Sequence, residues 1–176
     1  MQTEAQARIG LVFSLFDVNG NGRVEADDFE AMAGRVDAVA TASDDAARAR
    51  MTAAFRGYWE TLATELDTDR DGSVTPDEFA ACVLSPERFE DTVAEFAESL
   101  AALGDPDGDG RIERPLFIDL MTAIGFETAN TNALFDAFGP SGADEVEVPT
   151  WVEAIKDYYR PDKAGISGDL LVGGTG

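Results

Sequence analysis

The sequence predicts an all-α fold of four helix–loop–helix repeats, arranged as two pairs in one compact chain. In three twelve-residue segments, aspartate or asparagine fills positions one, three and five, and glycine fills position six. Apolar residues at helical spacing flank these segments. Position eight of these three segments and of a fourth, related one is apolar in each case, so paired segments can meet in short two-stranded β ladders. The four residues at position eight are Val24, Val74, Ile112 and Val146.

The first repeat predicts a helix over residues 4–16, a loop at 17–28 and an exit helix from Phe29. Carboxylate, amide and carbonyl oxygens are the donors that Ca²⁺ prefers, six to eight of them at about 2.3–2.6 Å. Asp28 at position twelve is one methylene shorter than glutamate. The site should therefore bind Ca²⁺ more weakly and tolerate Mg²⁺. The candidate ligands are Asp17, Asn19, Asn21, Arg23 at the backbone-carbonyl position, Glu25 and Asp28.

The second repeat, with its loop at 67–78, carries the pattern most completely. Gly72 permits the sharp turn at position six, and Glu78 at position twelve can bind an ion with both oxygens. Thr75 and Glu78 also predict a helix start with a reciprocal capping box. The candidate ligands are Asp67, Asp69, Asp71, Ser73 through its carbonyl, Thr75 and Glu78. This combination of loop and flanking helices is the EF-hand calcium-binding motif.

The first two loops begin 50 residues apart, which implies long helices or an extra turn between them. Ser43 is a good N-cap residue and predicts a break before the helix that enters the second loop. The run Ser85-Pro86-Glu87 predicts the start of the next helix, with serine as the cap and proline at the first helical position.

In the third loop, residues 105–116, the first half follows the calcium-binding pattern and the second half departs from it. Leu116 at position twelve carries no oxygen, and Glu113 is the remaining acid in the second half. Either Glu113 and water complete a weaker shell, or the loop keeps its shape without an ion. The candidate ligands are Asp105, Asp107, Asp109, Arg111 at the carbonyl position and Glu113. We expect Gly125 to end the exit helix.

The fourth segment, residues 139–150, retains only the apolar position eight, so it predicts a structural pairing partner rather than a metal site. An aromatic residue follows position twelve in every repeat, which supports four homologous hands or, equally, four ordinary core aromatics. These residues are Phe29, Phe79, Phe117 and Trp151. We expect an N-terminal pair in 1–84, a C-terminal pair in 85–160, and a tail, 161–176, whose apolar residues pack on the body.

The composition restricts the partners. The chain of 176 residues carries a formal net charge of −22, which makes nucleic acids and anionic membranes poor partners. No stretch approaches a membrane span and the start lacks a signal-peptide pattern, so we expect a cytoplasmic protein. We expect a monomer, and nothing in the sequence indicates a protein target.

The whole chain resembles the sarcoplasmic calcium-binding proteins, and most closely their bacterial, calerythrin-type relatives. The resemblance rests on the long gap between hands one and two, on the first loop ending in Asp27-Asp28-Phe29, and on the C-terminal Ala154–Tyr159 and Gly168–Leu171. It implies a compact unit of four EF-hands that buffers calcium. The chain departs from the family at Leu116 and throughout loop four, where these proteins usually retain ligands.

Two functions remain open from the sequence: a calcium buffer, and a calcium sensor that grips a target protein. Sensors use methionine-rich grooves, and this chain has four methionines in a core rich in phenylalanine and alanine. This favours the buffer. The same superfamily includes coelenterazine photoproteins, whose light emission depends on cavity histidines; this chain has no histidine. No enzymatic constellation stands out, so we do not expect an enzyme.

Overall fold

A computed structural model describes residues 2–67, 69–84, 90–158, 166 and 170–171, without the side chains of 2–6, 9 and 81–84. The helices in these ranges are α1 (Gln2–Phe16), α2 (Ala26–Val39), α3 (Asp45–Leu66), α4 (Pro76–Leu84), α5 (Glu90–Leu103), α6 (Arg114–Ile124), α7 (Thr128–Ala137) and α8 (Val148–Tyr158). The strands are β1 (Val24–Glu25), β2 (Ser73–Val74), β3 (Arg111–Glu113) and β4 (Glu145–Glu147). The predicted all-α class with short ladders is confirmed.

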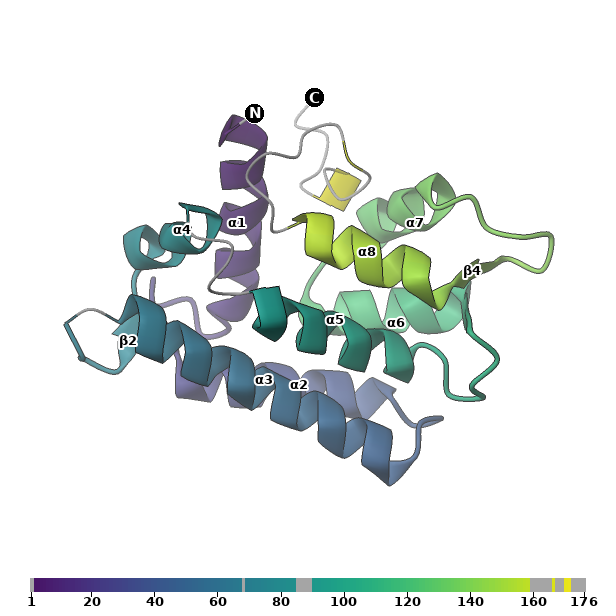
Figure 1. The fold of residues 1–176 in the computed structure, drawn as a ribbon, viewed down its shortest axis with the longest axis horizontal. Coiled ribbons are helices and arrows are strands. Elements are labelled where there is room, and N and C mark those ends of the chain that lie inside the picture. Colours follow the sequence, from purple (N-terminus) through teal and green to yellow (C-terminus); the bar gives the residue numbers. More distant parts are fainter. Residues whose placement is uncertain (1, 68, 85–89, 159–165, 167–169, 172–176) are drawn as a thin grey trace.

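The ladders pair hand one with hand two and hand three with hand four. Val24 lies opposite Val74 in the antiparallel β1–β2 pair, and Ile112 lies opposite Val146 in β3–β4. The predicted register is therefore confirmed at position eight in both pairs. Figure 1 shows the labelled strands β2 and β4 at opposite ends of the molecule.

The helix termini follow local chemistry, with one correction. In α4 the predicted capping box forms: the Glu78 N–H donates to Thr75 Oγ1 at 3.2 Å, and the Thr75 N–H donates to Glu78 Oε1 at 3.0 Å. The prediction of Ser43 as the N-cap of α3 is wrong. Asp44 caps this helix by accepting from the Ala47 N–H at 2.8 Å, because Ser43 is buried and donates its hydroxyl to the Leu103 carbonyl instead.

The predicted end of α6 at Gly125 is confirmed. Gly125 caps α6 with φ +123°, a conformation that favours glycine. The predicted helix start at Ser85 lies outside the described residues.

The two pairs share one hydrophobic core rather than enclosing one each. Phe29, Phe79, Phe117 and Trp151 are all at most 2% exposed. Between the pairs, α3 packs along α5 and α2 packs against α6, while α5 also contacts α8. Figure 1 shows α5 between α3 and α8. The apolar faces of the two pairs are thus buried against each other.

An apolar cavity of about 60 Å³ lies in this shared core, between helices of both pairs. Its wall includes Leu171, which is 6% exposed although it stands near the end of the chain. Leu170, which we expected to be buried, is 42% exposed. The cavity is lined by Val12, Leu15, Phe16, Phe96, Leu100, Met121, Ile124, Phe126, Leu134, Trp151, Ala154, Ile155, Tyr158 and Leu171.

Beside this cavity, the first helix is joined to the last by a pair of side-chain-to-backbone hydrogen bonds. Arg8 Nε donates to the Tyr158 carbonyl at 2.8 Å, and the Tyr158 hydroxyl donates to the Arg8 carbonyl at 3.1 Å. The Arg8 side chain is fully buried. Among the helices that the structure describes, none is long and apolar enough to cross a membrane.

Candidate metal centre

The second loop gathers three carboxylates where one cation could contact them all. One carboxylate oxygen from each of Asp67, Asp69 and Asp71 lies within 4.8 Å of the others. Two oxygens on the same Ca²⁺ at about 2.3–2.6 Å can be no more than about 5 Å apart. The arrangement therefore fits the ion that the sequence predicts for this loop.

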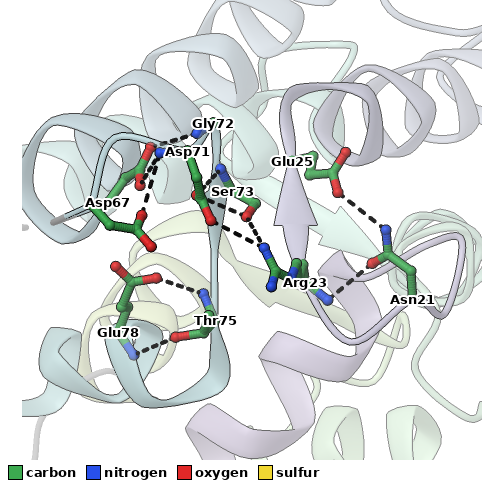
Figure 2. Close-up of polar contacts among 10 residues, drawn as sticks. Asn21, Arg23, Glu25, Asp67, Asp71, Gly72, Ser73, Thr75 and Glu78 are labelled. Carbon is green, nitrogen blue, oxygen red and sulfur yellow. Dashed lines mark hydrogen bonds and ion pairs between the residues drawn. The ribbon is translucent and has the colours of Figure 1, made fainter.

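Backbone amides fix the first carboxylate of this loop. Asp67 Oδ1 accepts from the Asp71 N–H at 3.1 Å, and Oδ2 accepts from the Gly72 N–H at 3.0 Å. Gly72 has φ +81°, so the chain turns back over Asp67 in a conformation that a residue with a Cβ would adopt at a cost. Figure 2 shows both bonds beside Glu78, whose carboxylate lies at the end of the loop.

The other two aspartates of this loop, Asp69 and Asp71, have pKa values shifted in opposite directions. The pKa of Asp69 is raised mainly by a hydrogen bond shared with Asp67 and, to a smaller extent, by burial. The backbone and hydroxyl of Ser73 lower the pKa of Asp71, because both donate to its Oδ1, at 2.9 and 3.0 Å. Crowded carboxylates of this kind repel each other, and a bound cation relieves the repulsion.

The first loop repeats this arrangement with amides in place of two carboxylates. Asp17 Oδ1 accepts from the Asn21 N–H at 3.1 Å and Oδ2 from the Gly22 N–H at 2.8 Å. The Asn21 side-chain amide donates to Glu25 Oε1 at 3.1 Å (Figure 2). Glu25 at position nine therefore turns toward the loop rather than toward solvent.

The short acid at position twelve of the first loop is buried. Asp28 is 2% exposed, and its two oxygens accept from the Glu25 N–H at 2.9 Å and the Asn19 N–H at 3.4 Å. Burial raises the pKa of this carboxyl. The side chain thus closes the loop toward position three, on the side where glutamate closes an EF-hand.

The third loop has an intact first half. Asp105 accepts from the Asp109 N–H at 3.0 Å and the Gly110 N–H at 2.9 Å. Carboxylate oxygens of Asp105, Asp107 and Asp109 lie within 4.8 Å of one another. Burial raises the pKa of Asp105. Leu116 is half-buried and packs on the core, so position twelve contributes packing where the second loop has a carboxylate.

The first residue of α6, Arg114, contacts the fourth loop through its guanidinium. Arg114 donates to both oxygens of Asp144 at 3.1 and 2.8 Å, to Asp136 at 2.6 Å and to Asn132 at 3.2 Å. Its guanidinium also lies 4.5 Å from the centre of the Phe135 ring. The bonds to Asp144 and Asp136 raise the pKa of Arg114. One positive charge thus joins α6, α7 and loop four, which supports the prediction of a structural partner.

Sequence reasoning missed the side-chain contacts of two arginines and one backbone feature. Arg23 and Arg114 contact acids of a neighbouring loop, and no spacing rule indicates this because the contacts depend on how loops pair in space. Position four of the loops has positive φ, at Gly20, Arg70 and Gly108. The glycines in loops one and three could have indicated this; Arg70 is the exception.

Comparison with known proteins agrees with this geometry. Residues 9–33 and 64–84 match the EF hand family. Calerythrin of Saccharopolyspora erythraea is 29% identical over 164 residues, which cover 88% of this chain and 92% of calerythrin.

Solved structures agree as well. One is a Streptomyces coelicolor calcium-binding protein that was studied for prokaryotic calcium-mediated regulation. It superposes with a TM-score of 0.73 at 25% identity, and the match covers 90% of this chain and 99% of that one. A sarcoplasmic calcium-binding protein from amphioxus shares the fold, with a TM-score of 0.67 at 21% identity over 97% and 96% of the two chains. EF-hand proteins of this kind bind calcium and are not enzymes, as the sequence led us to expect. Two segments of the chain match the EF hand family, and along most of its length the chain is similar to calerythrin and shares the fold of a sarcoplasmic calcium-binding protein.

Proposed function

We propose that this protein is a calcium buffer, a monomer in the cytoplasm whose function is to take up and release the ion. The observation that carries the proposal is the shared core. A sensor presents an apolar groove to its target, whereas here the apolar faces of the two pairs are packed against each other through α3 with α5 and α2 with α6. Exposing them to a target would require separating the halves of the molecule.

Hydrophobic-dye fluorescence in chelator and in saturating calcium tests this proposal. A buffer should bind little dye in either state, because calcium leaves the shared core closed. A large increase with calcium would favour the alternative function, a sensor that regulates a target protein. The Streptomyces coelicolor protein, described in terms of calcium-mediated regulation, makes that alternative worth testing.

We further propose that loops one, two and three bind the ions through the ligands predicted from the sequence, and that loop two binds most tightly. Loop two combines three clustered aspartates with a glutamate at position twelve. In loop one, Asp28 offers a shorter side chain, which suits the smaller, octahedral shell of Mg²⁺ as well as Ca²⁺. If this is correct, calorimetric titration with Ca²⁺ should show that added Mg²⁺ selectively lowers the apparent calcium affinity of loop one.

The C-terminal segment is proposed to cover the cavity. The burial of Leu171 supports this, as does its place in the cavity wall with Val12 and Leu15. Residues 161–165, 167–169 and 172–176 lie outside the described residues. Truncation after Lys163 should lower the free energy of unfolding and increase dye binding even with calcium present. A truncated chain that melts and stains like the full chain would contradict this proposal.

A further inference from the structure

The β1–β2 ladder brings an arginine of loop one onto a carboxylate of loop two. Arg23 occupies position seven of its own loop and directly precedes Val24, which pairs with Val74. Its Nη1 donates to Asp71 Oδ2 at 3.0 Å and to Ser73 Oγ at 3.2 Å (Figure 2). The guanidinium therefore lies on the fifth position of the neighbouring calcium loop.

Arg23 contacts the carboxylate oxygen of Asp71 that Ser73 does not use. Asp71 Oδ1 already accepts from both the backbone N–H and the hydroxyl of Ser73. Oδ2 accepts from the Arg23 guanidinium. An ion in loop two also needs one oxygen from Asp71, so the ion and the guanidinium require the same atom.

We propose that Arg23 sets the calcium affinity of loop two by competing with the ion for Asp71. This inference rests on the proposed calcium site in loop two. The Arg23 side chain is 52% exposed and Asp71 is 34% exposed, so the guanidinium can leave the carboxylate at little cost. Until it leaves, it places a positive charge against an incoming divalent cation. Loop two consequently binds calcium less tightly than its ligand set would allow.

The alternative is that Arg23 fastens the two loops together and preorganises loop two. The two accounts predict opposite signs. If Arg23 competes, Arg23→Ala should tighten loop two, by about twofold to tenfold, because a single and a double charge about 5 Å apart in water, partly screened by salt, repel by an amount of that order. If Arg23 preorganises the loop, the same substitution should weaken binding.

Isothermal titration of the full chain with Ca²⁺ is the test, and Glu78→Gln identifies which phase belongs to loop two. Arg23→Ala and Arg23→Met should both tighten that phase, whereas Arg23→Lys, which keeps the charge, should change it less. The difference between Arg23→Ala and the natural chain should shrink as salt is raised, because salt screens exposed charges.

Two controls separate this effect from net charge. Arg50 on α3 pairs with Glu95 and Glu98 on α5, and Arg56 on α3 pairs with Glu30 on α2. Arg50→Ala and Arg56→Ala should leave the loop-two phase unchanged. Equal tightening in a control, or an unchanged or weakened phase in Arg23→Ala, would overturn the inference. If Glu78→Gln removes no phase, the calcium site itself is wrong.

Discussion

Replacing Arg114 with methionine should destabilise the C-terminal pair whether or not calcium is present. The side chain is 22% exposed, and its partners Asp136 and Asp144 are 67% and 52% exposed. Exposed ion pairs contribute about 0.2–1 kcal/mol each, and a guanidinium over an aromatic ring adds about 0.5–1 kcal/mol. Methionine keeps much of the apolar stem and removes the charge. We therefore expect a loss of about 1–3 kcal/mol in the free energy of unfolding.

Urea unfolding, followed by far-ultraviolet circular dichroism in chelator and in saturating calcium, measures this loss. Arg56→Met is the control, because Arg56 on α3 also makes a two-pronged ion pair, with Glu30 on α2. The loss in Arg114→Met should exceed that in the control and be the same in both solutions. If calcium abolishes the loss, loop four binds an ion after all, and Arg114 is not its substitute.

The remaining predictions concern the loops. Glu78→Gln should remove the tightest calorimetric phase, and a trace that keeps it would refute the ligand assignment. Leu116→Glu should tighten loop three while costing the chelated protein about 1 kcal/mol of packing, since Leu116 is half-buried; an unchanged affinity would refute the role given to position twelve. Burial raises the pKa of Asp28 and Asp105, so just above the ordinary aspartate pKa these two carboxyls bind more protons in the folded chain than in the unfolded chain. In chelator, the contribution of these two groups to stability should therefore fall as pH rises through that window, and thermal melting at a series of pH values should show that Asp28→Asn removes its part of this fall. Finally, calcium at 100 times its dissociation constant should add about 2.7 kcal/mol per site; a melting temperature indifferent to calcium and to chelator would contradict ion binding.

Much of the fold could be predicted because the pattern is local. Twelve-residue loops fix the positions of Gly72 and Val74, and the apolar eighth position determines which strands pair. The sequence places the N-cap of α3 one residue too early, because Ser43 and Asp44 are both good N-cap residues. What distinguishes them is that the Ser43 hydroxyl donates to the Leu103 carbonyl, 60 residues away in the sequence. Long-range contacts of this kind leave no mark in the spacing of residues.

The candidate metal sites could be predicted from the sequence to a similar extent. A ligand type at a fixed position is visible in the sequence, so the clusters around Asp67 and Asp105 were expected. What a side chain does outside its own loop was not visible. Arg23 and Arg114 reach their acids only because antiparallel ladders set one loop beside the next.

The shared core ties together parts of the chain that bind no common ion. Helix α3 leads into loop two, packs along α5, and α5 in turn packs on α8 at the far end. Since neither half can open alone without exposing the other, ion uptake at the N-terminal loops should slow amide hydrogen exchange in α7 and α8. The molecule would then respond to calcium as one cooperative unit, with a hand that has lost its ligands protected by ions bound elsewhere.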